Sequence, residues 1–159
     1  MLDRPDRRLY VQLYGDEGTM RHIGHPLEEA QARRSFAAAC RANQSMPPTA
    51  RFWVIEEKPM GFPLGLIGLH WNGPTSAELG VVLPPAQQGK GIATAAIRNL
   101  LEPAFDTLRI ERLHTWHAAG HQLASGLMTS LGFVALREPT QHGGQCWELT
   151  ASAWRGRKG

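Results

Sequence analysis

Gly89 and Gly91 give this sequence its clearest chemical feature. They follow an apolar run, residues 77–83, and a pair of prolines that cannot extend a strand ladder. Glycine adopts positive φ angles readily and lets a ligand approach the backbone closely. A helical pattern begins at Ile92, so the backbone N–H groups of the loop and of the first helical turn should point at one spot. Such a spot favours a phosphate group.

The residues around these glycines distinguish between kinds of phosphate loop. The Walker motif fails because Gly89-Lys90 is followed by Gly91 rather than by serine or threonine. The dinucleotide fingerprint fails because Thr94 stands at its third position, where glycine or alanine is needed. A third pattern, Gln/Arg-x-x-Gly-x-Gly/Ala, fits at every position of residues 88–93.

Glu78 and His117 are the residues that could move a proton. Glu78 is an acid inside an apolar strand, and partial burial suits a carboxylate to general-base work, directly or through a water. The alternative is a structural acid hydrogen-bonded to a neighbouring strand. His117 is either a base or acceptor contact, or a core histidine. His114 and His117 point to opposite faces of their predicted strand, so together with His121 they do not predict a metal site.

The strands expected to position these residues follow from alternating and short apolar runs. They cover residues 51–57, 64–71, 77–83, 112–117, 133–137 and 146–150. The first three should form an antiparallel meander, and a glycine-rich loop from Pro139 to Gly144 should join the last two.

The expected helices follow from apolar positions at helical spacing. The first begins after Asp3 and buries Leu9, Tyr10, Leu13 and Tyr14. The second opens at Pro26 and buries Leu27, Ala30, Phe36, Ala37 and Cys40. The third follows Gly91 and ends or kinks at Pro103. The fourth covers residues 122–131, buries Leu123, Leu127 and Leu131, and stops at Gly132.

Composition indicates the class of protein. With 159 residues, 42% of them hydrophobic, the chain suits a single domain over residues 1–159. No apolar run of about 18 residues predicts a membrane span, and no N-terminal signal pattern is visible. Cys40 and Cys146 are two lone cysteines, which predicts reduced thiols and a cytoplasmic location. The net charge of +3 comes from scattered basic residues, which favours a solvated surface over nucleic-acid binding.

The loop pattern at residues 88–93, with Glu78-Leu79-Gly80 before it and Ser130-Leu131-Gly132-Phe133 after it, resembles the GCN5-related N-acetyltransferases, or GNAT family. Residues 13–16 and 20–24 resemble the ribosomal-protein alanine N-acetyltransferase branch. The resemblance implies an α/β (α+β) fold whose mixed, mostly antiparallel sheet of six to seven strands is flanked by about four helices.

The resemblance also implies a function and a set of site residues. The implied reaction is acetyl transfer from acetyl-CoA to a primary amine, on a protein N-terminus or a small molecule, by direct attack in a ternary complex. The implied cofactor-binding residues are Val81, Val82, Leu83, Gln88, Gly89, Lys90, Gly91, Ile92, Ala93, Thr94 and His121. The candidate acceptor contacts are Arg21, His22 and His25, in the loop that covers the acceptor site in relatives, and the alternative is that they are ordinary surface residues.

The sequence departs from the family pattern at sites that bear on catalysis. His121 stands where relatives have an asparagine, and Met128 where some have a tyrosine that protonates the leaving thiolate. Water or the Ser125 hydroxyl would then supply that proton, so the catalytic candidates are Glu78, His117 and Ser125. The alternative is a CoA-binding or regulatory domain without turnover.

The family's first strand is also expected to be missing, because only four residues precede Pro5. The strand at residues 51–57 would then present an uncovered apolar edge, which favours a homodimer over an edge that stays open and leaves this region less stable.

Overall fold

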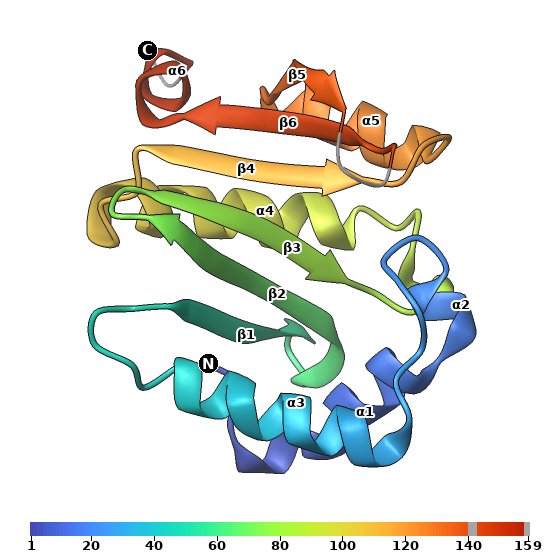
Figure 1. The fold of residues 1–159 in the computed structure, drawn as a ribbon. Coiled ribbons are helices and arrows are strands. Elements are labelled where there is room, and N and C mark those ends of the chain that lie inside the picture. The colour runs from blue at the N-terminus through green and yellow to red at the C-terminus, as the bar shows by residue number, and fades with distance from the viewer. Residues whose placement is uncertain (140–142, 158–159) are drawn as a thin grey trace. The chain divides into compact units, whose positions relative to one another are not determined.

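The computed structural model describes residues 1–139 and 143–157, so part of the predicted loop from Pro139 to Gly144 lies outside the described residues. Within these described ranges, six strands form a mixed sheet in the order β1-β2-β3-β4-β6-β5 (Figure 1), which confirms the predicted α/β class. The chain divides into two compact units. The first comprises Met1–His70 and Gly80–Ala93, and the second comprises Trp71–Leu79 and Thr94–Gly159.

The first unit begins with a capped helical segment. The Asp3 side chain accepts a hydrogen bond from the backbone N–H of Arg4 at 2.7 Å and forms a capping box with Asp6. The 3₁₀ turn η1 (Arg4–Asp6) leads into α1 (Arg7–Gly15), which buries Tyr10 and Leu13 as predicted. A short helix, α2 (Glu17–Met20), follows directly, where the sequence indicated only the end of α1.

The second predicted helix is α3 (Glu29–Ala42), and it differs from the prediction in start and in face. It begins three residues after Pro26, with Glu28 as its N-cap. Its buried residues are Ala32, Phe36 and Ala39, whereas Ala30 and Ala37 are exposed. The Phe36 ring packs edge-on to Tyr10 of α1 at 5.5 Å, and this contact sets the buried face. Ala32 and Ala39 lie four residues before and three after Phe36, so they share its face.

The strands of the first unit form an antiparallel pair. β1 (Ala50–Glu57) pairs with β2 (Phe62–Gly73), from Ala50 opposite His70 to Glu57 opposite Phe62, with an irregularity after Ile55. Helices α1 and α3 lie beside each other in this unit (Figure 1). The core that they share with the two strands and the end of β3 contains Leu2, Tyr10, Leu13, Phe36, Ala39, Ala50, Phe52, Leu66 and Val82.

The outer edge of β1 is covered at Phe52, which corrects the expectation of a bare edge. The Phe52 N–H donates to Asn43 Oδ1 at 2.7 Å. The Phe52 carbonyl accepts from the Leu2 N–H at 2.8 Å and from Asn43 Nδ2 at 3.2 Å. The Asn43 amide therefore satisfies this peptide much as a neighbouring strand would, and within the described residues β1 is the first strand of the chain.

The second unit contains the other pairings. β3 (Ser76–Val82) runs parallel to β4 (Arg112–His117), and β6 (Gln145–Thr150) pairs antiparallel with both β4 and β5 (Val134–Pro139). α4 (Ile92–Glu102) ends before Pro103, where the sequence predicted an end or a kink. A π-helical turn, η3 (Pro103–Thr107), follows it. The core of this unit includes Ile97, Leu101, Phe105, Ile110, Leu113 and Leu149.

The helix α5 (Gln122–Leu131) has the predicted bounds and ends at Gly132 with φ of 89°. Its predicted buried face is wrong at one end, because Leu123 is 69% exposed while Met128 and Leu131 are buried. A last helix, α6 (Ala151–Gly156), was not predicted from the sequence. Across the described residues, none of the helices has the length and apolarity that crossing a membrane would require.

Candidate active site

The loop between β3 and α4 has the backbone that its glycines predicted. Gly89 and Gly91 adopt φ angles of 72° and 75°, in the left-handed region that favours glycine. A Cβ built on either residue meets no atom of the described structure within 4 Å. Glycine is therefore required here by conformation and not by crowding within the chain. The backbone faces unfilled space, and the first N–H groups of α4 lack intrahelical partners as in any helix.

Residues on either side hold the loop in place. The Gln88 side chain donates from Nε2 to the Leu83 carbonyl at 3.0 Å, which ties the loop back to the end of β3. The 3₁₀ turn η2 (Pro85–Gln87) lies between them. Lys90 Nζ is 3.4 Å from Gln87 Oε1, a long contact on an exposed side chain. The Gln88 side chain therefore fixes the backbone of the loop, whereas the Lys90 ammonium is available to solvent or to an anion.

The end of β3 is fitted closely against β2. Gly65 leaves no room for a side chain, because a Cβ there would collide with the Val82 carbonyl and the Leu83 side chain. Val82 and Leu83 are buried, and Val81 is half-buried. The sequence pointed to these three residues as backbone donors or a ledge for a cofactor, but it gave no reason for glycine at position 65.

The loop with Arg21, His22 and His25 is held at both ends. Asp16 Oδ2 accepts hydrogen bonds from the Thr19 hydroxyl and the Thr19 N–H, both at 2.7 Å, and these bonds lower the pKa of Asp16. The Leu27 N–H donates to the Tyr14 carbonyl at 2.7 Å. A Cβ on Gly18 would lie 3.0 Å from Pro85 Cγ, so α2 packs against η2, close to the glycine loop. Arg21, His22 and His25 are all exposed.

In the second unit, the structure brings together two of the predicted catalytic residues. His117 Nε2 is 3.1 Å from the Ser125 hydroxyl, and His117 Nδ1 is 2.9 Å from the Ala118 carbonyl. A carbonyl only accepts, so we assign the proton of the neutral imidazole to Nδ1. Nε2 then accepts from the Ser125 hydroxyl. His117 is buried, and this pairing gives its imidazole a defined orientation.

Trp147 adjoins this pair and was not singled out in the sequence. Its ring centroid lies 6.0 Å from that of His117. Its buried indole N–H has no hydrogen-bond partner in the described part of the chain. A buried donor of this kind is costly unless a water or ligand atom satisfies it. The only sequence signal was the alternation in strand β6, where an inward-facing tryptophan usually serves the core.

Glu78 lies on the opposite face of its sheet from His117. Glu78 is in register with His114 of β4, and His114 with Glu148 of β6, so these three half-buried side chains share one face. His114 Nε2 is 3.6 Å from Glu148 Oε2. His117 follows His114 by three residues and points to the other face. Among the described residues, none donates a hydrogen bond to the Glu78 carboxylate.

His121 and Met128 are the two positions at which the sequence of α5 and its N-cap departs from the family pattern, and the structure shows the surroundings of both. The ring of His121 caps the helix, because Nδ1 accepts from the Ala124 N–H at 3.4 Å. This is the task for which asparagine is well suited. Met128 is buried and carries no dissociable proton. Among these α5 residues, the Ser125 hydroxyl is the group that can pass a proton from His117.

Comparison with known proteins identifies the class of protein that this fold and these residues define. The family model described as an acetyltransferase (GNAT) domain matches residues 2–134, which is most of the chain. The chain belongs to the GNAT acetyltransferase family.

One named protein is similar to part of this chain, and two solved structures share its fold. The Bacillus subtilis (strain 168) protein named "Putative ribosomal N-acetyltransferase YdaF" is 33% identical over 72 residues. That match spans 44% of this chain and 39% of the relative, about two fifths of its length. The spermidine N-acetyltransferase from Vibrio cholerae, solved with CoA and spermine, superimposes with a TM-score of 0.84 at 21% identity, covering 97% of this chain and 95% of that one. A GNAT-family acetyltransferase from Bacillus anthracis gives a TM-score of 0.72 at 18% identity, covering 92% and 89%.

Proposed function

We propose that this chain, acting as one acetyltransferase domain, transfers the acetyl group of acetyl-CoA to a primary amine by direct attack in a ternary complex. The observation that carries the proposal is the glycine loop, in which Gly89 and Gly91 adopt positive φ angles, have open space where a Cβ would lie, and come directly before α4. Acetyl-CoA, when bound, supplies a thioester that an amine can attack directly. No metal enters this reaction.

The cofactor residues divide by the part of the ligand that each would contact. The backbone N–H groups of residues 88–94 suit the pyrophosphate, and Lys90 adds an exposed positive charge. The backbone of Val81, Val82 and Leu83 suits the pantetheine chain, and a strand-end N–H there can polarise a thioester oxygen. His121 would contribute through the start of α5 that it caps.

The acceptor must lose a proton before it attacks, and its class decides how much help it needs. An N-terminal amine has a pKa of about 7.7–8.0 and is partly neutral near pH 7.5, whereas a lysine-like amine with a pKa of about 10.4 is almost fully charged there. Glu78 is our candidate base, because it is half-buried and none of the described residues donates a hydrogen bond to its carboxylate. A carboxylate that accepts no fixed hydrogen bond is better placed to accept a proton.

We assign protonation of the departing thiolate to the His117–Ser125 pair. When His117 carries a second proton, Nε2–H donates to Ser125 Oγ, and the serine hydroxyl can then donate onward. The 3.1 Å contact between the two side chains supports this relay. Histidine is the side chain that exchanges protons most readily near neutral pH, so the pair offers a better acid than water. The absence of a tyrosine hydroxyl at Met128 then does not prevent turnover.

The test is an amine panel with acetyl-CoA, monitored by thiol release and by the mass of the acetylated product. The panel should include spermidine and peptides with free N-termini, because the relatives above are named as a spermidine and a ribosomal N-acetyltransferase and because an N-terminal amine is partly neutral near pH 7.5. Arg21, His22 and His25 are our candidate acceptor contacts. Turnover of at least one amine is expected. Tight acetyl-CoA binding with no turnover on any amine would instead favour a CoA-binding domain.

Glu78→Gln tests the base on the best substrate of that panel. We expect a lower rate at neutral pH and partial recovery at high pH, where the free amine is abundant. Ser76→Ala, on the same strand and on the same face two residues away, is the matched control. An unchanged pH–rate profile for Glu78→Gln would return Glu78 to a structural role.

Compartment and assembly are separate proposals. Cys40 and Cys146 are both free thiols, which favours the reducing cytoplasm. A homodimer would bury the part of the β1 edge that lies outside Phe52. Because the Phe52 peptide already has hydrogen-bond partners within the chain, the reason to expect a dimer is weaker than the sequence indicated. Light scattering over a dilution series should detect a dimer. A constant monomer mass at high micromolar concentration would exclude it.

A further inference from the structure

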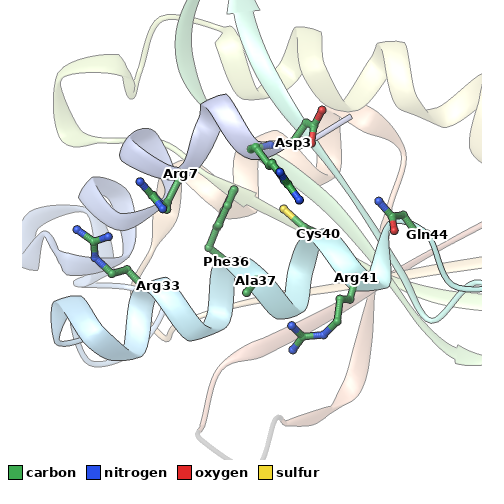
Figure 2. A pocket seen from close by; sticks show the side chains of 9 residues that line it. Asp3, Arg7, Arg33, Phe36, Ala37, Cys40, Arg41 and Gln44 are labelled. Atoms are coloured by element: carbon green, nitrogen blue, oxygen red, sulfur yellow. Dashed lines mark hydrogen bonds between the residues drawn. The ribbon is translucent and has the colours of Figure 1, made fainter.

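A pocket lies in the first unit, between its N-terminal segment and α3. It has a volume of about 410 Å³, and four arginines surround it: Arg4 and Arg7 from the N-terminal segment, and Arg33 and Arg41 from α3. Figure 2 shows Arg7 and Arg33 at one end and Arg41 at the other, with Phe36 and Cys40 between them. Asp3 is the single acidic residue of the lining.

The carboxylate and one of the arginines already have partners. The Asp3 carboxylate accepts a hydrogen bond from the Arg4 backbone N–H at 2.7 Å. Arg33 pairs with Glu29 at 2.6 Å along the exposed side of α3. The salt bridges of the described residues leave Arg4, Arg7 and Arg41 without a carboxylate within 4.0 Å. Three of the four guanidinium groups that line the pocket therefore have no carboxylate ion-pair partner among the described residues.

Arginines elsewhere in the chain are used differently. Arg51 donates to the carbonyls of Ala42, Ala50 and Ser45 at 2.7–2.9 Å. Arg155 pairs with Asp106 at 3.0 Å. Arg4, Arg7 and Arg41 have no carboxylate partner of this kind among the described residues, although guanidinium is suited to bidentate recognition of phosphate and carboxylate groups.

The inner wall of the pocket is apolar. Phe36 is buried and forms the wall between the two charged ends. Burial, followed by the charges of Asp3 and Asp6, raises the pKa of the Cys40 thiol, with Arg4 and Arg41 opposing the shift. Cys40 is therefore a protonated, weakly polar wall residue, which can report on occupancy of the pocket.

The spacing of the arginines selects the kind of anion. Arg33 and Arg41 are eight residues apart on α3, about 12 Å along the helix axis. A molecule with several charged oxygens along its length matches this spacing better than a single phosphate does. The volume is also within the range of about 300–1,000 Å³ that small-molecule sites occupy.

We propose that this arginine pocket is a binding site for a small polyanion, a metabolite-sized molecule carrying several phosphate or carboxylate groups, separate from the glycine loop. The site does not depend on the proposed acetyl transfer.

The test compares two charge-matched double variants of the full chain. Arg4→Gln with Arg41→Gln removes two arginines of the pocket. Arg8→Gln with Arg34→Gln removes two exposed arginines that are sequence neighbours of Arg7 and Arg33 but do not line it. Calorimetry with tripolyphosphate and with citrate distinguishes a phosphate from a carboxylate ligand. Binding of either probe to wild type is expected, at least tenfold weaker in the pocket variant and unchanged in the control variant.

Alkylation of Cys40 by iodoacetamide gives an independent readout. The bound probe should slow Cys40 modification in wild type and in the control variant, with no effect on Cys146 and no protection in the pocket variant. Gly91→Glu should leave this protection intact, because the glycine loop is a different site. The proposal is overturned if neither probe binds with a dissociation constant below about 1 mM, if both double variants lose binding equally, or if Gly91→Glu alone abolishes it.

Discussion

The first turns of α4 and α5 differ in how their backbone N–H groups are satisfied. Each helix begins with backbone N–H groups that have no intrahelical partner. Before α4 stands Gly91, which has no side chain, adopts a positive φ angle, and has open space where a Cβ would lie. Before α5 stands His121, whose own ring accepts a hydrogen bond from the Ala124 N–H. We propose that the first terminus uses its donors to bind a ligand, whereas the second uses one of them internally.

The difference shows which kind of helix start can be recognised in a sequence. An unsatisfied terminus that binds phosphate needs glycine at fixed positions, and this requirement leaves a motif. A self-capped terminus needs only one acceptor, and a histidine can replace an asparagine there. Its chemistry then depends on neighbours such as Ser125 and His117, which no local motif connects.

The largest effect is expected from closing the α4 terminus. Gly91→Glu places a carboxylate where the phosphate should sit, so the affinity for acetyl-CoA should fall by roughly 100-fold or more, about 2.7 kcal/mol. Gly61→Glu is the matched control, because Gly61 has φ of 73° and open space but lies in the β1–β2 turn. Calorimetry should show the loss in the first variant only. Equal acetyl-CoA affinity in both variants would contradict the proposal that the start of α4 binds the phosphate.

A smaller effect is expected from the proton relay at the start of α5. His117→Gln and Ser125→Ala should each lower kcat by about tenfold to 100-fold, and the double variant should be no slower than the slower single variant, because the residues act as a unit. Thr129→Ala, one turn further along the exposed side of α5, serves as control. Initial rates with saturating acetyl-CoA provide the measurement. Fully multiplicative losses would show that the two residues act independently.

The cap itself should contribute less. The His121–Ala124 hydrogen bond is long, so His121→Ala should lower the free energy of unfolding by about 0.5–1 kcal/mol, and His121→Asn should restore or exceed the original value. Urea unfolding at neutral pH measures both. If His121→Asn is as unstable as His121→Ala, the ring does not act as a cap.

The smallest effect is expected at the start of α2. This helix, like α5, is capped by a side chain of its own N-cap residue, Asp16. Because the Thr19 hydroxyl and N–H hold the pKa of Asp16 below its usual value, the cap stabilises the fold at pH values above about 4. This contribution is lost as the pH falls through the lowered pKa of the folded state. Asp16 is exposed, so the effect should be small. Thermal unfolding between pH 7 and pH 3 should show a steeper decline for wild type than for Asp16→Asn, and parallel declines would contradict the assignment.

The strands and helices with strong patterns could be predicted closely. β4 and α5 have the expected bounds because a turn and a glycine delimit them. The face of α3 could not be predicted, since alanines on all sides give little contrast until Phe36 meets Tyr10. α6 was missed because Thr150, which caps it, also ends the apolar alternation of β6.

The candidate site was predictable in its parts but not in its pairings. The glycine loop follows from backbone requirements that are local in sequence. The contact between His117 and Ser125 joins a strand to a helix, and it depends on the exact rotation of α5, which the exposed Leu123 made hard to infer. The separation of Glu78 from that pair needed the register of β3 with β4 as well as the alternation of side chains.

The covered edge at Phe52 has a consequence for chain entropy. Asn43 reaches Phe52 across nine residues, whereas Leu2 reaches it across almost the whole first third of the chain. Closing the longer loop costs more entropy, by about (3/2)RT times the logarithm of the length ratio. We therefore expect the N-terminal residues to be the last to dock and the first to release. Asn43 is tethered by the shorter loop, so it continues to occupy the hydrogen-bonding groups of Phe52 when Leu2 has undocked, and a strand from another molecule cannot pair there.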